Sequence, residues 1–109
     1  MPAITVDRRK EERFLLRLPI KARIAECISP FIAELTDVSA SGARCDVRGD
    51  ADTLHVDDCV AFGFVVPGWP KCQAKGQIVR IERPRTFGMA IDDTNEAFNA
   101  FIRLLASKR

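Results

Sequence analysis

The sequence predicts a small, mainly β protein: a six-stranded antiparallel β-barrel followed by a C-terminal α-helix. Three observations lead to this fold class. Apolar and polar residues alternate through six short segments, which is the period of a half-buried strand. Breaks rich in Gly, Pro, Ser and Asp separate these segments, and the last segment changes to helical spacing. Short strands joined by tight turns favour a sheet that closes on itself, and 109 residues suffice for one domain.

The first three predicted strands follow the alternation most clearly. Ile20, Ala22 and Ile24 fall on one face of the first strand, since successive side chains point to opposite faces. A Ser-Pro pair ends that strand, and small residues at 37–42 make the turn between the second strand and the third. The six predicted strands cover residues 18–24, 31–36, 43–48, 60–66, 71–83 and 87–91.

The later segments add two features. In the fifth strand the alternation changes phase between Gly76 and Val79, which predicts a bulge or a sharp bend. After the sixth strand, apolar residues recur three and four positions apart and predict a helix. The members of this helical stripe are Phe98, Phe101, Ile102 and Leu105. Asp93 is expected to cap the helix, with Glu96 three residues later completing a capping box.

The distribution of charge is more informative than its sum. The sequence has 17 Lys and Arg against 15 Asp and Glu, and this net charge of +2 is small for a general polyanion binder. Residues 1–12 are polar without an apolar period, so we expect a flexible N-terminal arm there and the barrel domain in residues 13–109. The N-terminus is charged where an export signal would be apolar, and no apolar run approaches the ~20 residues of a membrane helix. We therefore expect a cytoplasmic protein without membrane insertion.

Residues with catalytic or metal-binding chemistry are sparse in the sequence. The single histidine, His55, lies in a predicted polar loop, and the adjacent carboxylates at 57–58 and 92–93 would point to opposite faces of a strand. The four cysteines form no CxxC pair, so we expect buried free thiols rather than a zinc site. These cysteines are Cys27, Cys45, Cys59 and Cys72. We expect no catalytic residues, no metal and no cofactor, and therefore not an enzyme.

Two short patterns remain after these exclusions. The first is a series of arginines spaced by four, Arg9, Arg13 and Arg17, which contains two overlapping RxxxR matches. The second is the segment DVSASG at residues 37–42, which is typical of an Asx-type turn ending at a glycine with positive φ. Each pattern is common by itself, because the first also fits a helical turn with ion pairs and the second fits an ordinary hairpin.

Together, the two patterns resemble the PilZ domain, a family known as a receptor for the bacterial second messenger cyclic di-GMP. In that family an RxxxR arm precedes a DxSxxG motif at a turn between two strands. We favour Arg13 and Arg17 as the arginine pair, because an apolar strand follows Arg17 directly; Arg9 with Arg13 gives a second register. The resemblance extends over nearly the whole chain, and it includes FGMAI at residues 87–91 and the order of six strands before a helix.

The resemblance implies a ligand site built from the two motifs. The implied contacts to cyclic di-GMP are Arg9, Arg13, Arg17, Asp37, Ser39 and Gly42, with Arg8 and Arg44 as additional contacts. Arginine suits this ligand because its planar fork bonds phosphate oxygens, bonds guanine O6 and N7, and stacks on purines. Asp37 would accept hydrogen bonds from guanine N1–H and N2–H₂, and Gly42 would let the backbone approach the ligand closely.

The resemblance implies binding rather than catalysis. The expected function is that of a cyclic di-GMP receptor or adaptor. One or two ligand molecules would fold the N-terminal arm down and change the surface shown to an unidentified downstream protein partner. An alternative within the same fold is an adaptor that works through protein contacts and does not bind nucleotide. A barrel that binds single-stranded DNA or RNA is disfavoured, because the phenylalanines fall mostly on inward-facing positions and the net charge is small.

Overall fold

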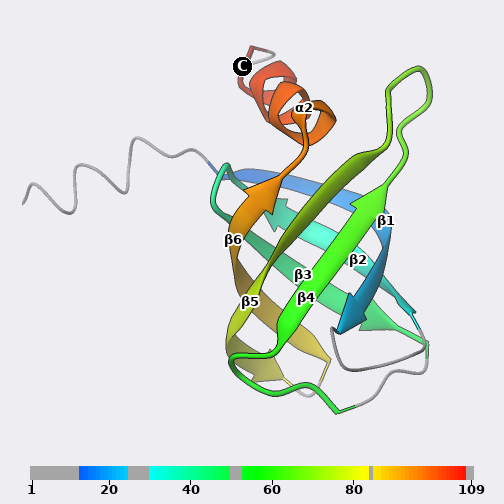
Figure 1. Ribbon diagram of the computed structural model, residues 1–109. Coiled ribbons are helices and arrows are strands. Elements are labelled where there is room, and N and C mark those ends of the chain that lie inside the picture. Colours follow the sequence, from blue (N-terminus) through cyan, green and yellow to red (C-terminus); the bar gives the residue numbers. More distant parts are fainter. Residues whose placement is uncertain (1–12, 25–29, 50–52, 84, 108–109) are drawn as a thin grey trace, which may run out of the picture.

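The computed structural model describes residues 13–24, 30–49, 53–83 and 85–107. Within these residues, six antiparallel strands precede one helix, as the sequence predicts (Figure 1). The elements are β1 (Phe14–Ile24), β2 (Phe31–Val38), β3 (Gly42–Arg48), β4 (Cys59–Phe64), β5 (Cys72–Arg83), β6 (Thr86–Thr94) and α2 (Glu96–Ser107). The predicted arm at residues 1–12 lies outside the described residues.

The strands form a closed barrel in the order β1-β2-β3-β6-β5-β4. Pairing of β1 with β4 closes it, from Lys21 opposite Gly63 to Ile24 opposite Val60. The six-stranded antiparallel barrel with a C-terminal helix is thereby confirmed. Closure means that each of the described strands is paired on both sides, so none presents an unpaired edge.

Strand β1 begins earlier than the sequence analysis predicts. Its first residue is Phe14 rather than Leu18, and Phe14 pairs with Val38 across a register shift that lies between Leu15 and Leu18. The alternation weakens here because the inward residues before Ile20 are only half-buried. The extension places Arg17 inside a strand and Arg13 immediately before it.

The barrel interior is filled by the inward residues of the six strands. Leu35, Ile78 and Phe87 are completely buried, which confirms the predicted inward phases of their strands. The predicted irregularity in β5 is also present, as a register shift between Lys75 and Gly76 against β6. A Cβ at Gly76 would lie 1.8 Å from the carbonyl oxygen of Ala90, so close contact between these two backbones requires glycine.

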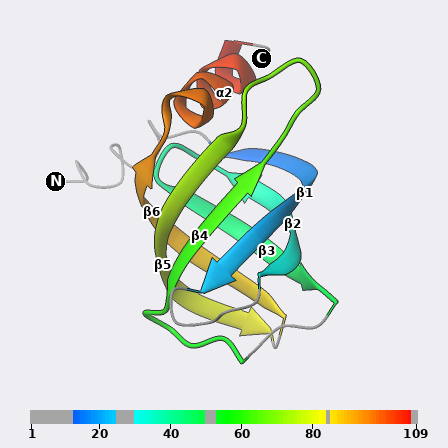
Figure 2. The same ribbon diagram turned by 45° about the vertical axis from the view of Figure 1, so that its right-hand side comes forward.

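Helix α2 covers one end of the barrel (Figures 1 and 2). Phe98 is completely buried and contacts Phe62 and Phe64 edge-to-face. Trp69, in the connection between β4 and β5, donates its indole N–H to the carbonyl oxygen of Ala97 at 3.1 Å and packs on the ring of Phe101. The amphipathic stripe of the helix is therefore used to close the core.

The helix is capped by Asn95, and the predicted cap at Asp93 is wrong. Asn95 Oδ1 accepts the backbone N–H of Phe98 at 2.9 Å, the position of an N-cap bond. The same oxygen accepts the N–H of Gln73 at 3.1 Å, and the Asn95 amide donates to the Lys71 carbonyl at 2.9 Å. Asp93 lies within β6, because that strand continues to Thr94 instead of ending at residue 91.

Replacing the cap residue tests this arrangement. Asn95→Ala is expected to lower the free energy of unfolding by about 2 kcal/mol, since it removes an N-cap and two bonds to the backbone of the β4–β5 connection. Asp93→Ala serves as the matched control and should cost less than about 0.5 kcal/mol, because its carboxylate is exposed. Urea denaturation of both variants measures the difference, and equal losses would contradict the capping assignment.

Candidate functional site

The turn between β2 and β3 is closed by Ser39 and Gly42. The backbone N–H of Ser39 donates to the Gly42 carbonyl at 2.9 Å, and the N–H of Gly42 donates to Ser39 Oγ at 3.1 Å. The N–H of Ile91 donates to the Ser41 carbonyl at 2.8 Å and ties the turn to β6. The sequence segment at residues 37–42 thus forms a fixed corner of the barrel.

Gly42 differs from the expected positive-φ glycine. Among the described glycines, only Gly49 and Gly68 have positive φ, so the turn closes without the left-handed conformation. A Cβ at Gly42 would lie 3.4 Å from the Met89 carbonyl oxygen, which is an ordinary contact. Gly42 therefore serves the site through the open space above its backbone rather than through its φ angle.

Arg13 is held against this corner by Asp37. Arg13 Nε donates to Asp37 Oδ1 at 3.2 Å, and Nη2 lies 3.0 Å from Oδ2, a two-pronged ion pair. The Asp37 side chain is 14% exposed, whereas that of Arg13 is 55% exposed. The pair fixes one edge of the guanidinium and leaves its other face open to solvent.

A groove of about 360 Å³ runs from this corner over β5 and β6. The residues that line it are Arg13, Ser39, Ser41, Gly42, Ala43, Val79, Arg80, Gly88, Met89 and Ala90. Three motif residues therefore share one concave surface, with Asp37 behind Arg13. These placements bring together Arg13, Asp37, Ser39 and Gly42 from the set that the sequence analysis names.

Arg80 is the groove residue that the sequence analysis missed. It pairs across the ladder with Gly88, and a Cβ on that glycine would lie 3.3 Å from Arg80 Cζ. The missing side chain lets the guanidinium lie over the β6 backbone. An arginine directly opposite a glycine is a usable signal, but it requires the register of β5 against β6.

Arg44 is directed away from the groove by an acidic partner. Arg44 Nη2 lies 2.7 Å from Glu82 Oε1, and Arg80 Nε lies 2.9 Å from Glu82 Oε2. Hydrogen bonds from Arg80 and then Arg44 lower the pKa of the Glu82 carboxyl, so this carboxylate stays charged between two cations. Arg44 is therefore not among the residues that line the groove.

The remaining predicted arginines do not line this groove. Arg17 Nε lies 3.5 Å from Glu34 Oε2, and Glu34 also binds Arg48 at 2.5 Å. The Arg17 side chain is 79% exposed, so it is only loosely held. Arg8 and Arg9 lie outside the described residues.

The thiols and the histidine take structural positions. Burial, with a smaller effect of Asp46, raises the pKa of the Cys45 thiol to about 12, and burial also raises the pKa of Cys72. Cys59 is exposed, so the expectation that it is buried is wrong; its side chain lies on the outer face of β4. The backbone N–H of His55 donates to Asp58 in a turn. Cys27 lies outside the described residues.

Two further searches of the structure give negative results. No group of three or more metal-binding side chains occurs in the part of the chain that the structure describes. No helix in that part is long and apolar enough to cross a membrane.

Comparison with known proteins gives one family and two related structures. A family model described as PilZ domain matches residues 7–107. The PilZ domain of CeSA from a cellulose-synthesizing bacterium is 20% identical, with a TM-score of 0.65 over 89% of this chain and 97% of that one. The Bacillus subtilis inhibitor of motility (MotI/DgrA) is 12% identical, with a TM-score of 0.71 over 92% of this chain and 50% of that one. No curated protein sequence matches significantly.

Thiol alkylation tests the positions of the cysteines. In a Cys27→Ser variant at about pH 8, iodoacetamide is expected to modify Cys59 in the folded protein and to reach Cys45 and Cys72 only after unfolding in urea, since the attacking species is an accessible thiolate. Mass spectrometry should show a single adduct without urea. Modification of Cys45 at the rate of Cys59 would contradict the burial described here.

Proposed function

Because the chain belongs to the PilZ domain family, we propose that it is a receptor for cyclic di-GMP and acts by binding rather than by catalysis. The observation that carries this proposal is the convergence of Arg13, Ser39 and Gly42 on one groove, with Asp37 beside them. These residues come from both sequence motifs and from two distant parts of the chain. We infer a bacterial cytoplasmic protein that needs no cofactor besides this ligand.

The chemistry of the groove complements the two parts of the ligand. The exposed face of Arg13 offers donors to a phosphate or to guanine O6 and N7. Asp37 accepts from guanine N1–H and N2–H₂, donors that adenine does not present on the same edge. Since the ligand supplies an anion for Arg13 and donors for Asp37, it can replace the ion pair without leaving either charge unpaired.

Arg80 gives the groove a second guanidinium on the opposite wall. Its plane lies over Gly88 and is oriented by Glu82, which limits the conformational entropy lost when a base stacks on it. Arg17 joins the ligand only by leaving Glu34, and the exposed 3.5 Å contact makes that exchange inexpensive. We keep Arg44 as an indirect contributor that orients Arg80 through their shared carboxylate.

The N-terminal arm is the part of the protein that we propose changes on binding. Its sequence carries Arg8 and Arg9 close before Arg13, so a ligand with two phosphates attracts them toward the same groove. Ordering residues 1–12 against the barrel would alter the surface available to a downstream protein. A stacked pair of ligands would offer four phosphates, which suits this number of arginines.

An adaptor that does not bind nucleotide is the second candidate function. One observation favours it: Arg13 and Arg17 already have acidic partners, Asp37 and Glu34, within the same chain. In that case the arginines would stabilise the barrel, and calorimetric titration with cyclic di-GMP would give no heat.

Alanine variants of the two motif arginines test the receptor proposal. Arg13→Ala and Arg17→Ala are each expected to weaken cyclic di-GMP binding by about 5- to 150-fold, through loss of one bidentate contact worth roughly 1–3 kcal/mol. Isothermal titration calorimetry measures the change, with GTP and cyclic di-AMP as ligand controls. Arg103→Ala on α2 is the matched control and should bind as the parent does. Parent-like affinity in both motif variants would refute the assignment.

The role of Arg80 is tested separately. Arg80→Ala is expected to weaken binding by about 2- to 30-fold through loss of a stacked cation, and Arg80→Lys should recover only part of this loss because it keeps the charge without the plane. Arg83→Ala, on the same strand and outside the groove, should leave the affinity unchanged. An equal effect of the alanine variants at 80 and 83 would indicate a general charge effect instead of a contact.

A further inference from the structure

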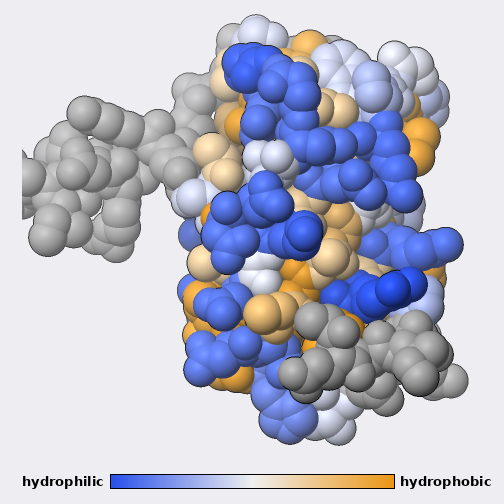
Figure 3. All heavy atoms as spheres, in the orientation of Figure 1, coloured by the Kyte–Doolittle hydropathy of each residue, from blue (hydrophilic) through white to orange (hydrophobic). Residues whose placement is uncertain are grey.

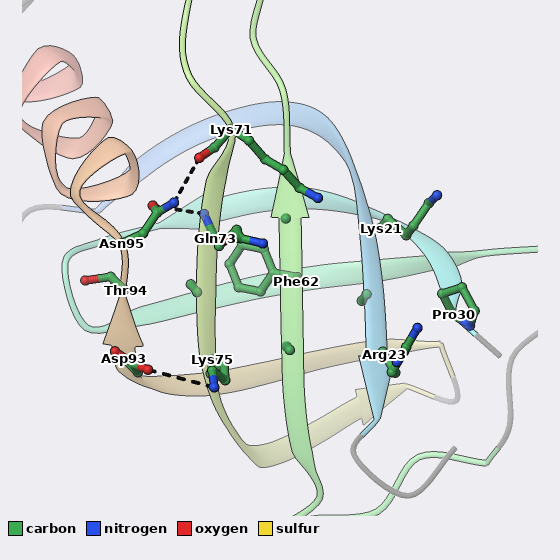
Figure 4. A pocket seen from close by; sticks show the side chains of 14 residues that line it. Lys21, Arg23, Pro30, Phe62, Lys71, Gln73, Lys75, Asp93, Thr94 and Asn95 are labelled. Atoms are coloured by element: carbon green, nitrogen blue, oxygen red, sulfur yellow. Dashed lines mark hydrogen bonds and ion pairs between the residues drawn. The ribbon is translucent and has the colours of Figure 1, made fainter. Parts of the chain in front are cut away.

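A second and larger groove, of about 590 Å³, lies on the outer face of β1, β4 and β5 near the start of α2 (Figure 4). We propose that this groove, named here the basic groove, binds an extended acidic segment of a partner protein. The proposal rests on the register of the three strands and on the charges along their outer face. It does not depend on whether the other groove binds cyclic di-GMP.

Small residues in β4 form the floor of the basic groove. Gly63 pairs with Lys21 of β1 on one side and with Gln73 of β5 on the other. Two residues away, Ala61 pairs with Arg23 and with Lys75 in the same manner. Long side chains therefore flank a strip with little or no side chain, and Figure 3 shows hydrophilic residues on both sides of a paler strip on this face. A peptide backbone can approach such a strip closely.

The walls of the groove are basic. Lys21 and Arg23 project from β1, and Lys71 and Lys75 project from the β5 side (Figure 4). One acidic residue, Asp93, also lines the groove; it lies 4.0 Å from Lys75, and both side chains are about two-thirds exposed. An exposed pair at this distance is weak, so the groove keeps an excess of positive charge.

The spacing of the cations fits an extended chain. Lys21 and Arg23 are two residues apart on one strand, so their side chains lie about 7 Å apart along the groove. Side chains on one face of an extended peptide repeat at the same distance. Acidic residues at alternate positions of a bound segment can therefore face successive cations on both walls.

The lining favours a protein segment over a nucleic acid. Phe62, the aromatic residue at the groove, is 3% exposed and belongs to the core, so it offers no face for stacking a base. Asp93 on the wall would repel a phosphate backbone. Since every described strand is paired on both sides, a partner cannot add a strand to the barrel and must be recognised by side chains.

The basic groove lies across the barrel from the motif corner. Its central strand, β4, is separated from β3 by two strands in either direction around the barrel. The groove at the motif corner involves β3, β6 and the later part of β5 instead. A segment in the basic groove would therefore leave the motif corner accessible.

A model peptide tests the basic groove directly. The probe is a fluorescein-labelled decapeptide of alternating glutamate and serine, with glutamine replacing glutamate in the control peptide. Fluorescence anisotropy of the full chain at low salt should detect the acidic peptide and not the control. Neutralising one cation on each wall (Lys21→Gln with Lys75→Gln) is expected to weaken binding by about 2- to 30-fold, since two exposed ion pairs are lost.

Matched controls separate a specific groove from general attraction. The double variant Arg83→Gln with Arg103→Gln has the same change in charge outside the groove and should bind the acidic peptide as the parent does. Amide chemical shifts of Ala61 and Gly63 should move on titration, and unfolding midpoints of both double variants should match the parent. The proposal is overturned if the parent does not bind, if both double variants lose affinity equally, or if a ten-nucleotide thymidine oligomer binds these lysines more tightly than the peptide.

Discussion

Pairing of β1 with β4 is the interaction on which the rest of this structure depends. Between Lys21 and Ile24, the second half of β1 completes the barrel, while the first half pairs with β2 beside the motif corner. Closure therefore fixes where Arg13 stands relative to Asp37, although 24 positions separate them in the chain. The same pairing aligns Lys21 and Arg23 with the small residues of β4. Both grooves follow from the course of one strand.

Most of the fold could be predicted from the alternation of residue types. Inward residues such as Leu35 and Phe87 are completely buried, because a one-residue slip would turn every apolar side chain of a strand outward. The predictions fail where a local preference has more than one solution. Asp93 and Asn95 are both suitable caps, and the continuation of β6 to Thr94 decides between them. Cys59 is outward because the strand alternation places it there, despite its apolar neighbours.

The candidate site could be predicted only in part, for a related reason. Asp37, Ser39 and Gly42 are close in sequence, so a motif can capture them. Arg80 and its partner Glu82 are brought to the groove by the pairing of β5 with β6, which includes three register shifts. No spacing rule encodes such a ladder. Likewise, the contact between Arg44 and Glu82 spans 38 positions and becomes visible only in three dimensions.

Strand β5 connects the two grooves, with Lys75 facing one and Arg80 facing the other. The register shifts next to Gly76 and between Ile78 and Arg80 interrupt the ladder between them. At such interruptions a strand can adjust its twist locally. Substitutions that reshape one end of β5 therefore need not disturb the other end, and the two surfaces are free to diverge independently in evolution.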